Sequence, residues 1–286
     1  MAVFEKHIIL NGEILPETLP SLHHNNRAFC YGDALFETMH AFGTEIQFAN
    51  DHFQRLFNGL QVLKMEFTDE LLPQKILREI TRLLNRDKLF GGVRIRLTVF
   101  RNTGGLFKPQ TNSTSYLIET KALDFEHYEL NQKGLSIDVF TELRKYYNAF
   151  SAFKTANSLV NVMAGIWAKE QNLDDCLITN EKGAIIESYH SNLFLIKGNN
   201  IFTPAIEQGC IDGVMRNNII KIASDTGMRI EQKIKLNEEA LVEADEIFLT
   251  NAIEGIRWVG AFKQRRYFNK TSKMLCFKLN EMAFGK

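Results

Sequence analysis

The chain has 286 residues and carries 34 Lys and Arg against 34 Asp and Glu, so its formal net charge is zero. Hydrophobic residues make up 45% of the sequence and charged residues 24%, which excludes a disordered chain, a collagen-like repeat and a coiled coil. This length predicts about two domains. The neutral charge balance argues against nucleic acid as a partner.

Targeting signals and metal-binding motifs are not found in the sequence. No apolar run is long enough to cross a membrane, and charge comes too early in MAVFEKHIILNGE for a signal peptide. The four cysteines lie far apart and the seven histidines show no ligand spacing. We therefore expect a cytoplasmic protein with reduced thiols, no membrane span and no metal.

The first 121 residues are predicted to form one domain in which strands and helices alternate. HIILNGEIL is typical of a hairpin with an Asn-Gly turn, and ALFETMHAF of a further strand. Apolar residues at helical spacing predict a helix capped by Asn50 or Asp51, and a second helix over residues 71–84. In VRIRLTVF every second residue is apolar, which predicts a strand with one buried face.

A polar connector over residues 122–133 is expected to separate this domain from a second one, residues 134–286. The helix predicted after Asn157 carries its apolar residues on one stripe, Leu159, Met163 and Ile166. Strands follow, and GVMRNNIIKIASDTG predicts a helix that Gly213 opens and Gly227 closes. The expected fold class is α+β (mixed α/β), with two domains.

Lys154 lies in SAFKTANS, between a predicted strand and a predicted helix, with apolar residues on both sides. A single lysine is most often a solvated surface charge. In a partly apolar pocket, however, a lysine can lose its proton near neutral pH and act as a nucleophilic amine. Lys154 is therefore a candidate catalytic residue.

Three other segments are candidates for binding a charged ligand. Glu187, in a strand-like run, is either a solvated strand-end acid or a buried carboxylate that needs a cation such as a protonated pyridine ring. Gly213 precedes a helix, which is either an ordinary turn or a phosphate site made of backbone N–H groups. Arg55 is either on a solvated helix face or a fixed cation for phosphate.

Together and in order, these segments resemble the class IV aminotransferases, the fold type IV enzymes that use pyridoxal phosphate. The resemblance covers nearly the whole chain. It is carried by YGDALFET, DHFQRL, FKTANSLVNVM, IIESYHSNLFLIKGNNIFTP, GCIDGVMR and TNAIEGI. The order of these segments is more specific than any one of them. The resemblance implies a two-domain fold type IV enzyme that forms a homodimer.

The resemblance also implies roles for individual residues. Lys154 would hold pyridoxal 5'-phosphate covalently and move the proton of the substrate α-carbon. Glu187 would pair with the pyridine nitrogen, and Arg55 would bind the phosphate. Further phosphate-side contacts would come from Gly213, Val214, Met215, Asn251 and Ala252.

The substrates implied by the resemblance are an amino acid, of branched-chain or D type, and a 2-oxo acid. Arg96 and Arg101 lie on the strand and turn that help form the substrate pocket in this family. Arg96 matches the arginine of the branched-chain IRP segment, and Arg101 matches a carboxylate-binding arginine of the D-amino acid enzymes. Tyr31 is a candidate for lining the pocket. Alternatively, Arg94 and Arg96 share one strand face, so one of them can be an ordinary solvated arginine.

Three alternatives stay open on the sequence. GVMR and TNA resemble aminodeoxychorismate lyase, which releases pyruvate, although Leu106 replaces the second arginine of the lyase segment. A non-catalytic protein that binds pyridoxal phosphate is a second alternative, which the joint presence of Lys154, Glu187 and Arg55 disfavours. The basic segment KQRRYFNKTSK suggests nucleic-acid binding, which the neutral net charge disfavours.

Overall fold

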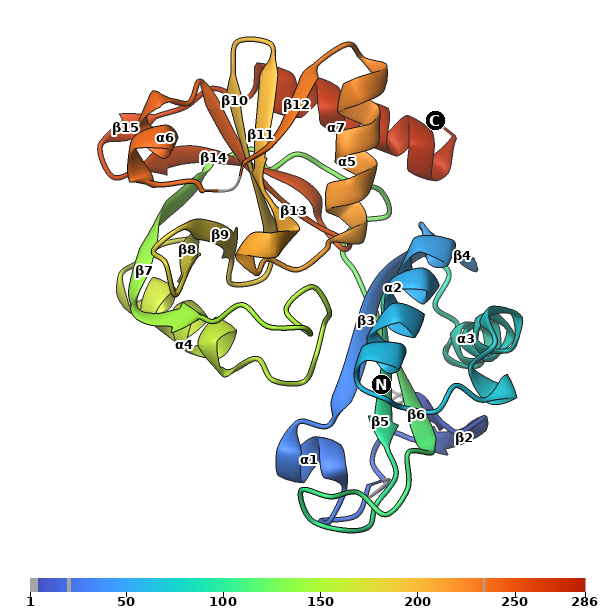
Figure 1. The fold of residues 1–286 in the computed structure, drawn as a ribbon. Helices are drawn as coiled ribbons and strands as arrows, with labels where there is room; N and C mark the ends of the chain where they lie inside the picture. The colour runs from blue at the N-terminus through green and yellow to red at the C-terminus, as the bar shows by residue number, and fades with distance from the viewer. Residues whose placement is uncertain (1–4, 20–21, 234, 286) are drawn as a thin grey trace. The chain divides into compact units, whose positions relative to one another are not determined.

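The computed structural model describes residues 5–19, 22–233 and 235–285. Two compact units are present (Figure 1). Unit 1 contains Met1–His127 and Phe153–Asn157, and unit 2 contains Tyr128–Ala152 and Ser158–Lys286. Helices and strands occur in both units, which confirms the mixed α/β class expected from the sequence.

Unit 1 is built on an antiparallel six-stranded sheet with the strand order β2-β1-β6-β5-β3-β4. The strands are β1 (His7–Leu10), β2 (Glu13–Pro16), β3 (Ala34–Phe42), β4 (Glu45–Ile46), β5 (Gly92–Arg101) and β6 (Thr114–Ala122). The helices are α1 (Arg27–Tyr31), α2 (Ala49–Val62), the 3-10 helix η1 (Asp69–Leu71) and α3 (Pro73–Asp87). Helices α2 and α3 lie beside the sheet in Figure 1, and their apolar residues share one core with it.

The N-cap of helix α2 lies two residues before Asn50 and three before Asp51, its expected caps. This N-cap is Phe48, whose backbone has φ 55° and whose side chain makes no capping hydrogen bond. Asn50 and Asp51 therefore lie inside the first turn, and the prediction of either as the cap is wrong. The expected apolar face is confirmed, because Phe53, Leu56 and Leu60 are buried in the core.

Unit 2 is built on a nine-stranded mixed sheet, with the path β12-β11-β10-β13-β14-β7-β8-β9 and β15 paired to β14. The strands are β7 (Leu135–Lys145), β8 (Asp175–Asn180), β9 (Ile185–Ser188), β10 (Asn192–Lys197), β11 (Asn200–Pro204), β12 (Arg229–Lys233), β13 (Glu246–Asn251), β14 (Gly255–Phe262) and β15 (Arg265–Arg266). The helices are α4 (Leu159–Glu170), η2 (Ile206–Gln208), α5 (Val214–Asp225), α6 (Glu238–Glu243) and α7 (Lys270–Phe284). Gly213 is the N-cap of α5 as expected. Gly227 closes the helix, also as expected: it follows the C-cap Thr226 with φ 78°, and its N–H donates to the carbonyl of Ser224 at 3.0 Å.

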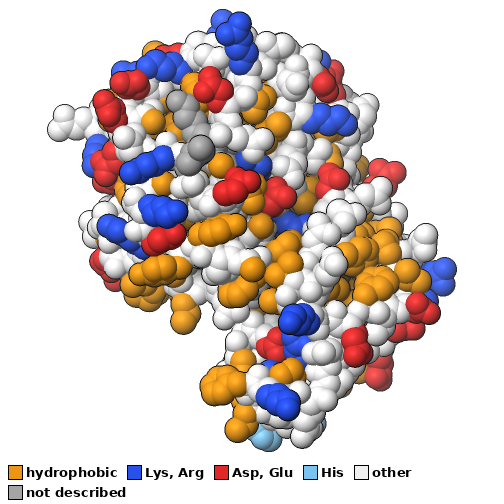
Figure 2. All heavy atoms as spheres, in the orientation of Figure 1, with side chains coloured by type: hydrophobic (Ala, Val, Ile, Leu, Met, Phe, Trp, Pro, Cys, Tyr) orange, Lys and Arg blue, Asp and Glu red, His pale blue; other side chains and the backbone are white. Residues whose placement is uncertain are grey.

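The apolar stripe of α4 does not face the core of unit 2. Leu159, Met163 and Ile166 are 79%, 39% and 46% exposed. The buried side of α4 consists of Ala164 and Ala168, which pack against a small cluster around Phe140. Figure 2 shows hydrophobic side chains gathered on the surface where α4 lies. An apolar stripe at helical spacing marks a face that needs a partner, and here that partner is not the core of the same unit.

The division between the units falls between His127 and Tyr128, within the connector predicted over residues 122–133. The sequence did not predict that Phe153–Asn157 would join unit 1. This segment is bound to β3 like a short strand: Phe36 N–H donates to the carbonyl of Lys154 at 2.8 Å, and Ala156 N–H donates to that of Ala34 at 2.9 Å. These backbone bonds attach Lys154 to the sheet of unit 1.

Candidate active site

Lys154 and Arg96 lie over the same aromatic ring. The Nζ of Lys154 is 4.8 Å from the centroid of the Phe36 ring, and the guanidinium carbon of Arg96 is 3.8 Å from it. Phe36 and Arg96 are on the antiparallel strands β3 and β5, and the main chain of Lys154 is bonded to Phe36. Unit 1 thus brings two of the sequence-predicted site residues, Lys154 and Arg96, to one aromatic ring.

Arg55 is bound to an acid that the sequence analysis did not single out. Its Nε and Nη2 donate to the two carboxylate oxygens of Glu37, at 2.9 and 2.6 Å. His52 Nδ1 is 2.7 Å from Glu37 Oε2. The positive charge of Lys154 is close enough to lower the pKa of His52. Arg55 therefore belongs to the same group of charged side chains as Lys154.

Glu187 is buried in unit 2, where both of its oxygens have partners. Lys145, the last residue of β7, places its Nζ 2.6 Å from Oε1. The backbone N–H of Ile211 donates to Oε2 at 2.8 Å. Glu187 is thus a buried carboxylate rather than a solvated strand-end acid, and it has the cationic partner that a buried carboxylate needs. In the described structure this partner is Lys145.

The start of helix α5 lies beside Glu187, because Ile211 is two residues before the N-cap Gly213. No described side chain caps this helix end. A Cβ on Gly213 would come within 1.9 Å of Asn192 Oδ1, so a larger residue here would displace the Asn192 amide. The backbone N–H groups of Val214 and Met215 open the helix, as a phosphate site at a helix N-terminus requires.

The end of strand β13 lies next to this helix start. Thr250 pairs with Asn192 in the sheet, and Asn192 Nδ2 donates to the carbonyl of Ile211 at 2.8 Å. The hydroxyl of Thr250 is buried, and within the described residues it has no hydrogen-bond partner. A buried hydroxyl without a partner is costly, and a bound ligand with an acceptor oxygen would satisfy it.

Asn251 and Ala252 form the turn that follows β13. The Asn251 amide donates to Ser191 Oγ and to Glu254, and its oxygen accepts the backbone N–H groups of Ile253 and Glu254. The side chain of Asn251 is therefore engaged in shaping this turn. Glu187, Gly213 and Asn251 are brought to one region of unit 2 by these contacts.

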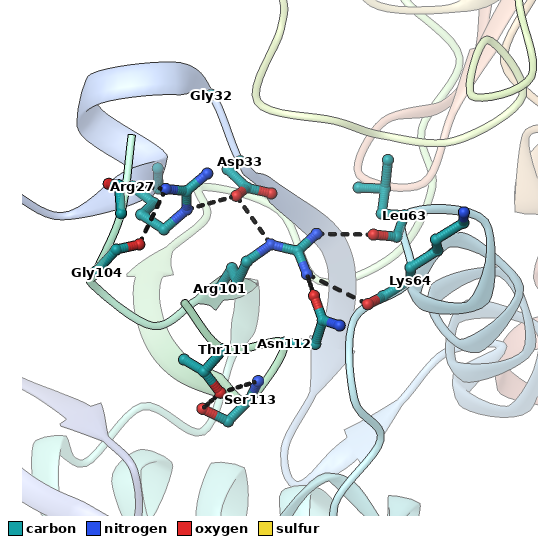
Figure 3. A network of polar contacts seen from close by, with 12 residues as sticks. Arg27, Gly32, Asp33, Leu63, Lys64, Arg101, Gly104, Thr111, Asn112 and Ser113 are labelled. Atoms are coloured by element: carbon teal, nitrogen blue, oxygen red, sulfur yellow. Dashed lines mark hydrogen bonds and ion pairs between the residues drawn. The ribbon is translucent and has the colours of Figure 1, made fainter. Parts of the chain in front are cut away.

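Arg101 belongs to a different network, which is centred on Asp33 (Figure 3). Arg101 Nε donates to Asp33 at 2.9 Å, and its other contacts are the carbonyls of Leu63 and Lys64 and the side chain of Asn112. Four of its five N–H groups are thus directed at acceptors in the protein. The geometry favours a structural role for Arg101, which ties the end of β5 to the end of α2.

Tyr31 packs near the same network. Its ring lies 4.9 Å from the guanidinium carbon of Arg27 and 5.5 Å from the ring of Phe107. Arg27 in turn bonds Asp33 and the carbonyls of Gly104 and Leu106. This arrangement fixes the loop after β5 against α1 within unit 1.

Three further features bear on function. In the described part of the chain, no group of three or more His, Cys, Asp or Glu side chains could hold a metal ion. No helix within the described ranges is long and apolar enough to cross a membrane. Lys263, the first residue of the basic segment KQRRYFNKTSK, pairs with Glu238, and Lys278, which follows the segment, pairs with Glu281, so acids offset part of the positive charge of this region.

The sequence reasoning missed Glu37, His52 and Lys145. Glu37 lies on the same face of β3 as the buried Leu35 and Met39, and an acid on the apolar face of a strand is a signal for a buried pair. His52 precedes Arg55 by three residues on α2, so both lie on one helix face. For Lys145 no sequence signal is evident, because its contact with Glu187 depends on the sheet topology of unit 2.

The chain is similar to known proteins. The family model described as amino-transferase class IV matches residues 34–262. The chain is 25% identical to a putative branched-chain-amino-acid aminotransferase of Methanocaldococcus jannaschii, covering 96% of this chain and 94% of that one. It is 27% identical to the aminodeoxychorismate lyase of Bacillus subtilis, covering 86% and 83%.

A solved structure has the same fold. It is that of a branched-chain amino acid aminotransferase from Thermobaculum terrenum in its PLP form, with a TM-score of 0.84, 20% identity, and coverage of 98% of this chain and 94% of that one. The family resemblance expected from the sequence is confirmed by the family model. The chain belongs to the class IV aminotransferases.

Proposed function

We propose that this protein is a pyridoxal-phosphate-dependent aminotransferase that moves an amino group between an amino acid and a 2-oxo acid. The observation that carries this proposal is the placement of the Lys154 amine and the Arg96 guanidinium over one ring, that of Phe36. A reactive amine beside a cation that can bind a carboxylate suits a substrate that is an amino acid.

Each unit, taken by itself, carries residues that suit part of the cofactor. Lys154 and Arg55 of unit 1 would hold its aldehyde carbon and its phosphate. In unit 2, Glu187 would bind the pyridine nitrogen, and the backbone at Gly213, Val214 and Met215 would bind the phosphate. The unpartnered hydroxyl of Thr250, beside this helix start, and the turn at Asn251 and Ala252 provide further polar groups.

When bound, the cofactor supplies an electron sink for the carbanion formed at the substrate α-carbon. The Lys154 amine would hold the cofactor and, once the substrate amine had displaced the lysine, would take the proton of the substrate α-carbon and give a proton back. The Glu187 carboxylate would favour a proton on the ring nitrogen of the bound group. The Arg96 guanidinium holds the substrate carboxylate, and so fixes the α-carbon within reach of the lysine.

Substrate class is best tested with a panel of donors. Branched-chain L-amino acids are the first candidates, because a branched-chain enzyme is among the relatives of this chain. L-glutamate and D-alanine, each with 2-oxoglutarate or pyruvate as acceptor, complete the panel. We expect Lys154→Ala to abolish transamination and the visible absorption band. Normal transamination in Lys154→Ala would refute the assignment.

A second candidate activity is aminodeoxychorismate lyase, which the Bacillus subtilis relative favours. It would release pyruvate and 4-aminobenzoate from aminodeoxychorismate, with the same lysine. Leu106 is 74% exposed on the loop where the lyase segment has an arginine. Pyruvate release from aminodeoxychorismate without any transamination would place the lyase first.

We also propose that the enzyme is a cytoplasmic homodimer that binds no nucleic acid. The exposed stripe of α4, with Leu159, Met163 and Ile166, is a suitable surface for a second copy. The four cysteines are free thiols, as in a reducing compartment. Analytical ultracentrifugation tests the assembly, and a monomer at micromolar concentration would contradict it.

A further inference from the structure

Arg55, the proposed phosphate-binding arginine, forms a buried group with two other side chains, Glu37 and His52. Their exposed fractions are 3%, 1% and 9%. Glu37 comes from β3, while His52 and Arg55 are one turn apart on α2. The Glu37 carboxylate makes two bonds to Arg55 and one to His52, so it is in contact with both helix residues.

Glu37 is ionised at neutral pH. Burial opposes its ionisation, but the charge of Arg55 and the hydrogen bonds from His52 and Arg55 lower its pKa to about 2. So acidic a carboxyl is a poor general acid or base near neutral pH. Glu37 is therefore suited to holding its neighbours in place rather than to transferring protons.

His52 is suited to fix the plane of this carboxylate. Because Glu37 is ionised, Nδ1 of His52 carries the proton of their hydrogen bond. Burial lowers the pKa of His52, and the charges of Arg55 and Lys154 lower it against the opposing effect of Glu37. A neutral His52 adds no positive charge beside the two cations. Its Nε2 is buried and, within the described residues, without a hydrogen-bond partner.

We propose that Glu37 and His52 are positioning residues that hold Arg55 in one orientation for binding a phosphate monoester. This inference rests on the proposed function, in which Arg55 binds the cofactor phosphate. Glu37 engages the Nε–Nη2 edge of the guanidinium, and a guanidinium can meet paired phosphate oxygens along its Nη1–Nη2 edge. Glu37 also offsets the repulsion between Arg55 and the nearby Lys154.

The test compares two ligands that differ only in phosphate. Apoprotein is titrated with pyridoxal 5'-phosphate and with pyridoxal, which has the same ring and aldehyde. For Glu37→Gln we expect about a tenfold or greater loss of affinity for the phosphorylated ligand, since a charge-assisted paired bond is replaced by a neutral one. The affinity for pyridoxal should equal that of the wild type. His52→Gln should show a smaller loss with the same selectivity.

The chain offers a matched control in the same unit. His7 Nδ1 lies 2.6 Å from Asp87 Oδ1, and Arg86 lies 3.4 Å from the other nitrogen of His7. Asp87→Asn thus removes a carboxylate from a similar acid–histidine–arginine group. It should leave the affinities for both ligands unchanged. Thermal stabilisation by inorganic phosphate gives a second readout, which Glu37→Gln should reduce and Asp87→Asn should not.

Each result decides between the two proposals. If Arg55→Met leaves the affinity for pyridoxal 5'-phosphate unchanged, the phosphate assignment of Arg55 itself fails. If Arg55→Met weakens that affinity but Glu37→Gln and His52→Gln do not, only the positioning role fails. Equal losses for both ligands in Glu37→Gln would also overturn the positioning role. If Glu37→Gln does not fold, His52→Gln carries the same comparison.

Discussion

Lys145 Nζ lies 2.6 Å from Glu187 Oε1, in a pair whose side chains are 18% and 3% exposed. The second carboxylate oxygen accepts the backbone N–H of Ile211, beside the start of α5. Lys145 thus neutralises the buried acid within the protein and holds it toward the end of the helix. A protonated ring nitrogen would be a second cation for the same carboxylate, which has lone pairs for both.

Replacing Lys145 with methionine should destabilise the apoprotein. Breaking a buried pair leaves an uncompensated charge, and with Lys145 partly exposed we expect a loss of about 2 kcal/mol in the free energy of unfolding. Pyridoxal phosphate should recover part of this loss, because its ring nitrogen supplies the missing cation. Urea denaturation with and without cofactor measures both effects.

Lys197→Met is the matched control for this change. Lys197 pairs with Glu243 at 2.7 Å, but both side chains are 54% exposed. Such a surface pair contributes about 0.5 kcal/mol or less. If Lys145→Met costs no more than Lys197→Met, or if the cofactor stabilises both equally, Lys145 has no special relation to Glu187.

Thr250→Val should raise the free energy of unfolding of the apoprotein and lower its affinity for the cofactor. The Thr250 hydroxyl is buried without a partner in the described structure, and replacing it by a methyl group removes a desolvation cost of about 1 kcal/mol. Thr203 is also fully buried, but its hydroxyl donates to the carbonyl of Leu193 at 2.9 Å. Thr203→Val should therefore lose stability. Chemical denaturation of both variants, followed by cofactor titration, distinguishes a ligand site from an ordinary buried threonine.

Arg96 and Arg101 should differ in what their loss affects. Arg96 is partly exposed, and its nearest acid, Glu119, is 3.9 Å away. Arg96→Met should raise KM for the amino donor about tenfold or more and leave the melting temperature nearly unchanged. Arg101→Met should cost roughly 3 kcal/mol of stability, because it leaves Asp33 and three other acceptors without this donor. A KM effect for Arg101→Met without loss of stability would restore Arg101 as a substrate ligand.

The acid limb of the stability profile should carry the signature of Glu37. Its pKa falls from 4.5 to about 2 on folding, because the bonds from Arg55 and His52 outweigh the opposing effect of burial. The corresponding stability, roughly 3 kcal/mol, is fully present above pH 4.5 and is lost as the pH falls toward 2. Subtracting the profile of Glu37→Gln from that of the wild type isolates this contribution. A difference that is flat between pH 4.5 and 2 would contradict it.

The sequence predicted elements best where one periodicity governs them. In β5, the buried Val93, Ile95, Leu97 and Val99 alternate with more exposed residues, as expected. The caps of α2 were wrong because a residue with positive φ, Phe48, starts the helix, and such a start has no side-chain signature. The sequence predicted that Leu159, Met163 and Ile166 share one face of α4, but periodicity alone does not tell which surface covers that face, and these residues are exposed here.

Lys154 and Glu187 could be singled out from the sequence as candidates, because each lies in a segment that resembles the family. The supporting contacts could not be predicted, since they join residues far apart in the sequence. Lys145 reaches Glu187 across the sheet of unit 2, and Glu37 reaches His52 and Arg55 across the β3–α2 layer. Arg101 was a candidate because it matches a family position, but this match did not predict the acceptors that surround its guanidinium, such as Asp33 and the carbonyl of Leu63.

The central claim is that the ε-amine of Lys154 binds the cofactor aldehyde, and chemical trapping tests it most directly. Purified holoenzyme is reduced with borohydride, digested and analysed by peptide mass spectrometry. The account predicts one pyridoxyl-phosphate group, on the peptide that contains Lys154, together with loss of the visible absorption band. A label on Lys145 or another lysine, or no label in active enzyme, would contradict it.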